Sequence, residues 1–333
     1  MQDSAPQKTT RQYSMKKFLY ITLAAAIALI SCNKSELDGG EMVTLDYKVG
    51  MPYAATKAAT IGDGSHVDEV VCAVFENGAE VAALRKTFSR NADGTFPNYQ
   101  PSLYLGREYQ IVFWAHKEGK YDVTKMDDIT YGANGYATND ENMDAFTLTQ
   151  TVKINKDKTV TLGTGAEAQT MQMTQMTATL KRPFAKLNVG TVASDWTSDV
   201  TVTHSRITLS MVQTHFNAVT GKVVEEKYLE NQKYYAAIPA QTFEVDGIEY
   251  KYVSLNYLFP GSLAEVTIEL ATKDFGAADF DPETDVVFEV TKDGVPVNGN
   301  QQTNMIGNVL KGELNFTVTI DGDFDSAQNN NEF

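Results

Sequence analysis

The residues best suited to catalysis in this chain of 333 residues are few and widely spaced. No run matches a nucleophile elbow, a paired zinc-binding histidine motif, a paired-cysteine motif or a glycine-rich phosphate loop. The four histidines each stand alone in the sequence, at His66, His116, His204 and His215. A catalytic pair would need the fold to bring distant residues together. We therefore predict that the protein is not an enzyme and that it binds no cofactor and no metal.

One acidic run near the C-terminus has the spacing of a calcium-binding loop. Its carboxylates match loop positions 1, 3, 5 and 12, at Asp321, Asp323, Asp325 and Glu332. The sixth position, where glycine allows a sharp turn, is Ser326, and no flanking helices are evident in the sequence. We interpret the run as a solvated acidic tail.

Cys32 has the clearest chemical context in the chain. Two lysines precede an apolar run at 18–29, which is typical of a signal peptide and too short to span a membrane comfortably. The following Leu-Ile-Ser-Cys at 29–32 resembles a bacterial lipobox, in which the cysteine is lipidated and becomes the new N-terminus. We predict lipidation of Cys32, with a simple cleavable signal followed by a free cysteine as the alternative. The sequence leaves the true start open between Met1 and Met15.

Composition excludes several classes of partner. The chain has 28 basic and 43 acidic residues, so its formal net charge is -15. Phosphate groups would be repelled by this charge, which argues against nucleic acid. Hydrophobic residues make up 42% of the chain, which is too many for a disordered protein.

If Cys32 is lipidated, Cys72 is left as a single free thiol. Cys72 alternates with Val70 and Val74, which predicts that it is a small buried side chain on one face of a strand.

The body of the chain shows the period-two alternation of β-strands. Apolar and polar residues alternate over 265–270, and the segment 109–116 is apolar on both faces, which favours a central strand. Asp246 and Gly247 separate two short alternating runs and predict a hairpin. A short helix near 123–129 is compatible with the sequence. The pattern as a whole predicts an all-β chain with two antiparallel sandwiches.

The best domain boundary lies within 163–179, where residues 166–176 are rich in Gln, Met and Thr and poor in large aliphatic residues. A strand predicted over 178–189 follows it, and Pro183 inside this strand suggests an edge position or a bulge. The predicted divisions are an N-terminal extension and signal peptide over 1–31, a lipidated tether over 32–41, an N-terminal β-sandwich over 42–170, a C-terminal β-sandwich over 177–322 and an acidic tail over 323–333.

Several strings that follow the lipobox in order resemble one known family. They are the strand at 42–49 with Thr56, Lys57 and Ala58 after it, the run at 109–115, the segments 139–140 and 144–146, the Leu-Lys-Arg-Pro-Phe-Ala-Lys-Leu run at 180–187, and the stretches 295–297 and 303–310. The set resembles the fimbrillin-like lipoproteins of Bacteroidales, the superfamily of type V pilus subunits. The resemblance implies two transthyretin-like β-sandwich domains in tandem, on a lipoprotein at the surface of the outer membrane.

The resemblance also implies a mechanism of assembly. In this family a trypsin-like protease cuts after a basic residue, usually arginine, in the loop after the first strand, and so removes the lipid and that strand. A C-terminal strand of another subunit then fills the groove, because it satisfies the unpaired backbone groups and the apolar slot. Here the first strand would be 42–50. The candidate processing site would be Lys57 and Ala58, where lysine replaces the usual arginine.

A second difference from the stalk subunits of this family lies at the other end of the chain. The last core-like strand, predicted over 313–320, is followed only by the acidic, Asn-rich residues 321–333 and by no further apolar donor strand. We therefore expect a non-catalytic surface lipoprotein that is an anchor or accessory component, not a stalk subunit, in pilus assembly or adhesion.

The expected partners follow from the same resemblance. They are other fimbrial subunits through strand exchange, the outer membrane through the lipid on Cys32, and a host or bacterial surface receptor, with no nucleic acid. The alternative is a surface glycan-binding or ligand-binding lipoprotein that does not polymerise.

Overall fold

Strands account for almost all of the regular structure in the computed structural model of this chain. The structure describes residues 40–51, 64–196, 201–261, 263–307, 310 and 317–321. Among these residues the only α-helix is α1, Pro282–Asp285, and no helix is long and apolar enough to cross a membrane. The all-β class predicted from the alternation is therefore confirmed.

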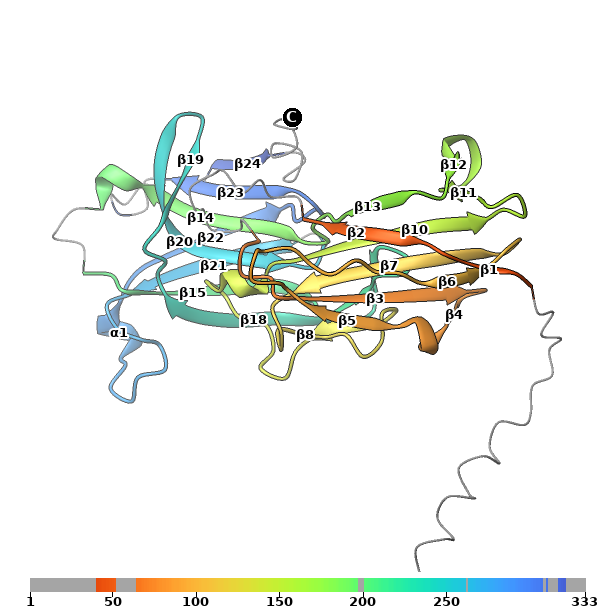
Figure 1. Cartoon of the computed structure of the whole chain (residues 1–333). Coiled ribbons are helices and arrows are strands. Elements are labelled where there is room, and N and C mark those ends of the chain that lie inside the picture. The colour runs from red at the N-terminus through yellow and green to blue at the C-terminus, as the bar shows by residue number, and fades with distance from the viewer. Residues whose placement is uncertain are drawn as a thin grey trace, which may run out of the picture. The chain divides into compact units, whose positions relative to one another are not determined.

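Seven strands of the first half form one antiparallel sheet in the order β12-β11-β10-β7-β3-β4, with β5 also paired to β3 (Figure 1). Their bounds are β3 Glu69–Glu76, β4 Ala79–Glu80, β5 Lys86–Ser89, β7 Glu108–His116, β10 Ala145–Ile154, β11 Thr159–Leu162 and β12 Gln169–Gln172. The central strand β7 lies between β10 and β3 and buries side chains on both faces, as the apolar run at 109–116 predicted.

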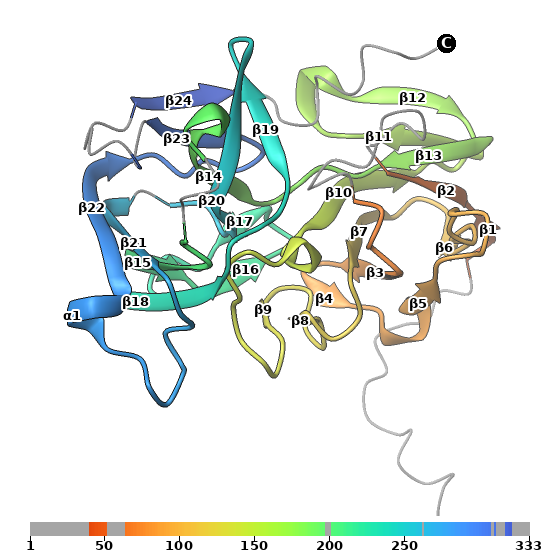
Figure 2. The ribbon, with the colours of Figure 1, turned by 90° about the vertical axis from the view of Figure 1, so that its left-hand side faces the viewer.

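A second layer covers one face of this sheet. It consists of β1, Met42–Thr44, paired with β6, Ser102–Tyr104, and of β2, Asp46–Gly50, paired in parallel with β13, Gln175–Thr179 (Figure 2). The apolar core between the two layers contains Cys72, which is completely buried beside Val70 and Val74. The predicted role of Cys72 as a small buried side chain is thus confirmed, and its burial raises the pKa of the thiol.

The second half of the chain forms two further sheets, with strand orders β19-β20-β14-β23-β24 and β18-β15-β21-β22. Their bounds are β14 Ala185–Val192, β15 His204–Gln213, β18 Tyr228–Ala237, β19 Thr242–Val245, β20 Ile248–Leu258, β21 Leu263–Ala271, β22 Val286–Val295, β23 Gln302–Gly307 and β24 Thr317–Asp321. The predicted hairpin is confirmed, because β19 pairs with β20 across Asp246 and Gly247, which both have positive φ.

A small sheet joins the two halves of the chain. It has the order β17-β16-β9-β8, with bounds β8 Tyr121–Asp122, β9 Ile129–Tyr131, β16 His215–Asn217 and β17 Lys222–Val223. Beside it, Trp114 of β7 contacts Phe184 and Phe216, with ring centroids 6.1 and 5.7 Å apart. The helix expected near 123–129 is wrong, because Asp122 closes a turn by accepting from the backbone N–H of Thr124 and β9 begins at Ile129.

The continuous strand predicted over 178–189 is also wrong. Strand β13 ends at Thr179 and β14 begins at Ala185, so Pro183 lies between two strands that belong to different sheets. The chain turns there around a buried ion pair, in which Arg182 Nη2 lies 2.8 Å from Asp144 Oδ2 and the guanidinium stacks on Phe146. A proline without an N–H group can stand at this break because no strand partner is needed.

Candidate functional site

The residues to which the sequence assigned a modification all lie outside the described part of the chain. Cys32, Lys57 and Ala58 are among them, as are the signal peptide, most of the tether and the tail at 323–333. Lipidation of Cys32 and processing at Lys57 therefore stay predictions. What the structure does describe is the strand that precedes the candidate processing site, and the groove in which that strand lies.

We call this groove the first-strand seat. It holds β2 between residues 98–101 on one side and β13 on the other, and β1 pairs with β6 on the first side only. On the first side, Tyr47 and Tyr99 exchange backbone hydrogen bonds of 2.9 Å in both directions. The N–H of Leu45 also donates to the carbonyl oxygen of Pro101 at 3.0 Å. Together with the pairing of β1 to β6, these bonds fix one edge of the first strand.

The second wall of the seat is β13. It runs parallel to β2, with Met176 opposite Tyr47 and Ala178 opposite Val49. Beyond the end of β13, the N–H of Leu180 donates to the carbonyl oxygen of Gly50 at 3.0 Å. Strand β2 is therefore paired on both edges, and its departure would leave backbone donors and acceptors without partners on both walls.

The inward side chains of β2 fill an apolar slot over the seven-stranded sheet. Leu45, Tyr47 and Val49 alternate inward and are 1%, 0% and 6% exposed. The Tyr47 ring meets Phe113 of β7 edge to face, with centroids 5.5 Å apart, and its hydroxyl donates to Gln150 Oε1 at 3.0 Å. Burial raises the pKa of the Tyr47 hydroxyl, which therefore remains a hydrogen-bond donor at neutral pH.

One wall of the slot is fixed by contacts of its own. The Tyr99 ring packs against Phe113 at 5.9 Å and against Phe88 at 6.4 Å between centroids. Its hydroxyl donates to the carbonyl oxygen of Leu84 at 2.6 Å. These contacts do not involve β2, so the wall keeps supports that would remain if the first strand were exchanged.

The outward face of β2 has a polar contact with both walls. Asp46 Oδ1 accepts from Asn98 Nδ2 at 2.9 Å and from Gln100 Nε2 at 3.1 Å. Asp46 Oδ2 accepts from Gln175 Nε2 at 2.9 Å. These hydrogen bonds, led by that from Gln175, hold the pKa of Asp46 below its usual value. Sequence reasoning missed all four residues, because amide side chains in polar segments have no pattern of their own.

A cavity of about 380 Å³ lies at the end of β2. It is lined by Lys48 and Val49 on the strand and by Arg90, Asp93 and Phe96 from the segment after β5. The Arg90 guanidinium donates to three backbone carbonyl oxygens, those of Gly94, Ser65 and Val67, so it also holds the wall of the cavity. The volume is within the range of small-molecule sites, which begins at about 300 Å³.

The histidines make local contacts from separate elements. His116, at the end of β7, is 1% exposed, with its Nε2 atom 3.5 Å from Glu69 Oε1. Burial lowers its pKa to about 4, so the ring is neutral at pH 7 and this contact is not an ion pair. The Nδ1 atoms of His204 and His215 share hydrogen bonds with the hydroxyl of the preceding threonine. Each of these contacts fits a structural role.

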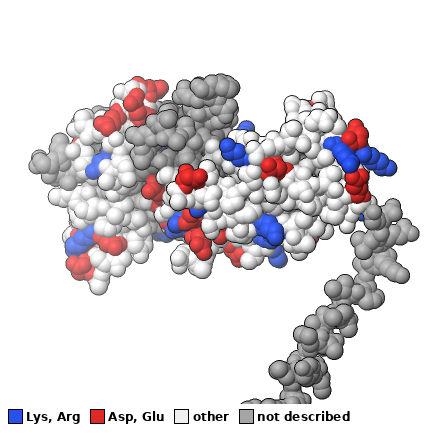
Figure 3. Space-filling model, viewed as in Figure 1, with Lys and Arg blue, Asp and Glu red and all other residues white. Residues whose placement is uncertain are grey.

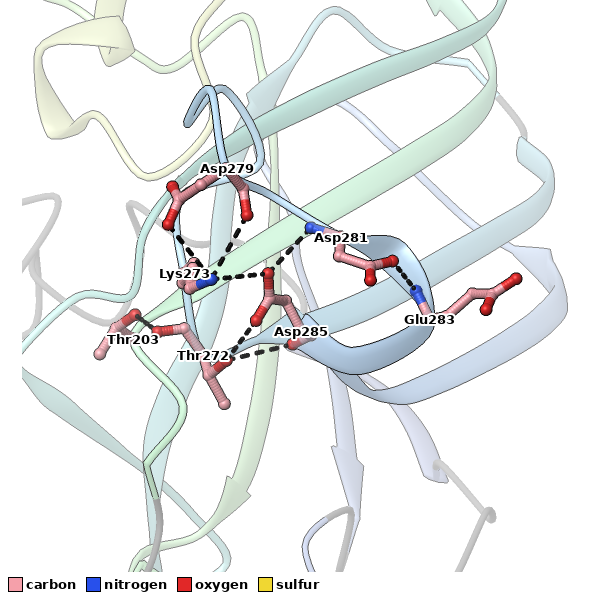
Figure 4. Close-up of polar contacts among 7 residues, drawn as sticks. All are labelled: Thr203, Thr272, Lys273, Asp279, Asp281, Glu283 and Asp285. Atoms are coloured by element: carbon pink, nitrogen blue, oxygen red, sulfur yellow. Dashed lines mark hydrogen bonds and ion pairs between the residues drawn. The ribbon is translucent and has the colours of Figure 1, made fainter.

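The loop between β21 and β22 gathers several carboxylates around one lysine (Figure 4). Lys273 Nζ lies 3.4 Å from Asp279 Oδ2 and 3.2 Å from Asp285 Oδ2, and its hydrogen bond to Asp285 is the main cause of its raised pKa. Asp281 accepts from the N–H of Glu283 and caps α1. These acids therefore close the loop. In the described part of the chain, no group of His, Cys, Asp and Glu side chains is arranged to hold a metal ion.

On the face shown in Figure 3, the charged side chains do not mark a binding site. Basic and acidic side chains lie there in small groups, some of both signs and some of one sign, separated by uncharged surface. No large basic patch that would attract a polyanion is visible on this face. The first-strand seat is thus the described feature with the most specific geometry.

Comparison with known sequences gives one match at the level of a family. The model of DUF6562, described as a family of unknown function, matches residues 37–332. A search of curated proteins finds no match.

Comparison with solved structures gives distant likenesses only. A putative cell adhesion protein from Bacteroides ovatus is 12% identical at a TM-score of 0.44, over 84% of this chain and 96% of that one. A fimbrial assembly protein from Parabacteroides distasonis is 13% identical at 0.40, over 84% and 100%. The fimbrial anchor protein Mfa2 from Porphyromonas gingivalis is 11% identical at 0.38, over 84% and 98%. At these scores the likeness carries no argument about function, which must come from the seat.

Proposed function

The chain belongs to the DUF6562 family, and we propose its function from the groove that holds its first strand. The protein is a surface lipoprotein held in the outer membrane through Cys32, and it is an anchor or accessory component in fimbrial assembly or adhesion. It works by β-strand complementation with other fimbrial subunits. The observation that carries the proposal is that β2 is paired on both edges, with β13 and with Tyr99, and that its inward side chains fill an apolar core.

The physical argument rests on what an exchanged strand would gain. A vacated seat would present the backbone groups of residues 98–104 and of β13 without partners, together with the slot that now holds Leu45, Tyr47 and Val49. An extended segment of another subunit can satisfy both, because main-chain pairing gives affinity and alternate side chains give specificity. Two sandwich domains, over 42–170 and 177–322, are part of the proposal.

An anchor or accessory position follows from the sequence that surrounds the strand. Lys57, in the segment after β2, is the only basic residue near the expected processing position, and it is not the usual arginine. An uncut chain remains attached to the lipid through the tether. Its first strand leaves the seat only when a strand of another subunit displaces it, and it stays joined to the body of the protein. Such a subunit could hold a fibre at the membrane without becoming part of its stalk.

Treatment of the purified mature protein with a trypsin-like protease tests this position. We expect no SDS-resistant ladder, and we expect the first strand to stay with the body of the protein, as judged by mass spectrometry after gel filtration. The Lys57→Gln variant is the matched control for cleavage at the candidate site. Release of the first strand followed by ladders that require Lys57 would instead assign the protein to the stalk. Incorporation of labelled palmitate in cells, and its loss in Cys32→Ser, tests the lipid anchor.

The cavity at the end of β2 favours one alternative, a surface glycan-binding or ligand-binding lipoprotein that does not polymerise. Its volume of about 380 Å³ and its mixture of apolar and charged lining residues suit a small ligand. Retention of the protein on a glycan array or in affinity gels, with no binding to fimbrial subunits, would favour this alternative.

A further inference from the structure

Three side-chain amides converge on one carboxylate in the first-strand seat. Asn98 and Gln100 come from one wall, Gln175 comes from the other, and all three donate to Asp46 of β2 at 2.9 to 3.1 Å. Asp46 points outward, so it contributes nothing to the apolar slot. Its contacts therefore need an explanation other than core packing.

We propose that Asp46 and these three amides form a register key, by which the seat selects the strand that occupies it. The proposal rests on the proposed function and names the chemistry of the partner. The partner strand, supplied by another subunit, carries an acidic residue in the position of Asp46, with an apolar residue before it and an aromatic residue after it. Leu45 and Tyr47 hold those two flanking positions in the chain's own strand.

The inward apolar pattern alone does not exclude every shift of a strand along the groove, although the Tyr47 ring on Phe113 and its bond to Gln150 favour the native position. A slip of one residue is excluded, because it would turn the inward side chains to the outer face. A slip of two residues keeps apolar side chains inward, since Leu45, Tyr47 and Val49 are all apolar. That slip would bring Thr44 or Lys48 to the amides.

The amides penalise this two-residue slip. A carboxylate accepts several hydrogen bonds through its two oxygen atoms, whereas an ammonium accepts none and a hydroxyl is a single oxygen. The three donors therefore match Asp46 and do not match Lys48 or Thr44. The key thus adds to the register preference that Tyr47 gives in the apolar slot.

Strand exchange in the mature chain tests the key. A recognition site for a specific protease is placed within 54–59, and the folded protein is cut there so that its first strand is held only by the seat. A fluorescent peptide of residues 41–51 is then added in excess, and its binding is followed by anisotropy. Peptides with Asp46→Asn and Lys48→Gln are compared, and the second is the matched control because Lys48 is exposed on the same strand.

The Asp46→Asn peptide is expected to bind about two- to threefold more weakly than the wild-type peptide, because the three hydrogen bonds lie on an exposed face, and the Lys48→Gln peptide about as well. In a protein with Gln175→Met, the effect of Asp46→Asn should shrink, because the two changes remove the same hydrogen bond. Equal binding of the Asp46→Asn and wild-type peptides would overturn the key while leaving strand exchange intact.

Failure of every peptide to enter the seat would count against the proposed function, and a second measurement then decides the key. In cut proteins that carry Asp46→Asn or Lys48→Gln in their own first strand, the urea concentration at which that strand is lost is measured. The key predicts earlier loss for Asp46→Asn only. Equal midpoints in the two variants and the wild-type protein would refute it.

Discussion

Tyr47 should dominate the hold of the seat on the first strand. Its side chain is completely buried, and an aromatic ring of this kind removes about 150–250 Å² from water. At about 25 cal/mol per Å², this burial is worth about 4–6 kcal/mol, which is close to the cost of about 3–5 kcal/mol for truncation of a buried aromatic residue. We therefore expect Tyr47→Ala to lower the free energy of unfolding by about 3–5 kcal/mol.

The hydroxyl and the ring of Tyr47 make separable contributions. Tyr47→Phe keeps the edge contact with Phe113 and loses only the hydrogen bond to Gln150, so it should cost about 0.5–1.5 kcal/mol. Gln150 is partly exposed, and water can take the place of the lost donor. The difference between the free energies of unfolding of Tyr47→Ala and Tyr47→Phe measures the contribution of the buried ring separately from that of the hydroxyl.

Equilibrium urea unfolding, followed by near-ultraviolet circular dichroism, measures these costs. Tyr228→Ala is the matched control, because Tyr228 is 43% exposed on an edge strand and should change the free energy of unfolding by less than about 0.5 kcal/mol. If Tyr47→Ala cost no more than Tyr228→Ala, the first strand would not be held by its inward side chains, and the reasoning about the seat would fail.

Two further outcomes concern a buried histidine and a half-buried asparagine. Burial lowers the pKa of His116 to about 4 from its ordinary 6.5, so the folded state is favoured fully above pH 6.5. As pH falls toward 4, the free energy of unfolding should drop by roughly 3 kcal/mol, because the unfolded chain binds the proton more tightly. Urea midpoints measured at several pH values should therefore fall less steeply in His116→Gln than in the wild-type protein. Asn139 has a φ of +58°, accepts from the N–H of Leu255 and donates to the carbonyl oxygen of Ala237. Asn139→Ala should therefore lower the free energy of unfolding in urea by about 2–4 kcal/mol. Asn139→Gly should lower it by less, because glycine tolerates a positive φ.

Local patterns predicted the parts of the fold that depend on local physics. The burial of Cys72 and the central position of β7 follow from side-chain alternation, because neighbouring positions on a strand face opposite sides of the sheet. The hairpin at Asp246 and Gly247 follows from residues that tolerate positive φ. Each of these features is encoded within about ten residues of sequence, which is the range over which periodicity can be read.

The features that failed, or were missed, depend on partners far away in the sequence. Asp46 and Gln175 are 129 residues apart, and only the parallel pairing of β2 with β13 brings them together. The pairing of β9 with β16 also joins distant segments, since it places His215 opposite Thr130, and nothing in either short segment indicates the other. Amide side chains and strands of three residues have too little pattern of their own to indicate a partner.

The division of the strand predicted over 178–189 has a consequence for the seat. Because β13 ends before Pro183, it can serve as a wall for β2 while the chain continues into a different sheet. Its end is fixed independently of β2, since Lys181 and Thr147 exchange backbone hydrogen bonds of 2.7 and 2.9 Å and Arg182 is paired with Asp144. The C-terminal end of this wall, tied to β10 in this way, retains its position when the first strand leaves. This part of the seat is therefore already ordered before a strand binds. Binding of an incoming strand then carries a smaller entropy loss, which leaves a more favourable binding free energy.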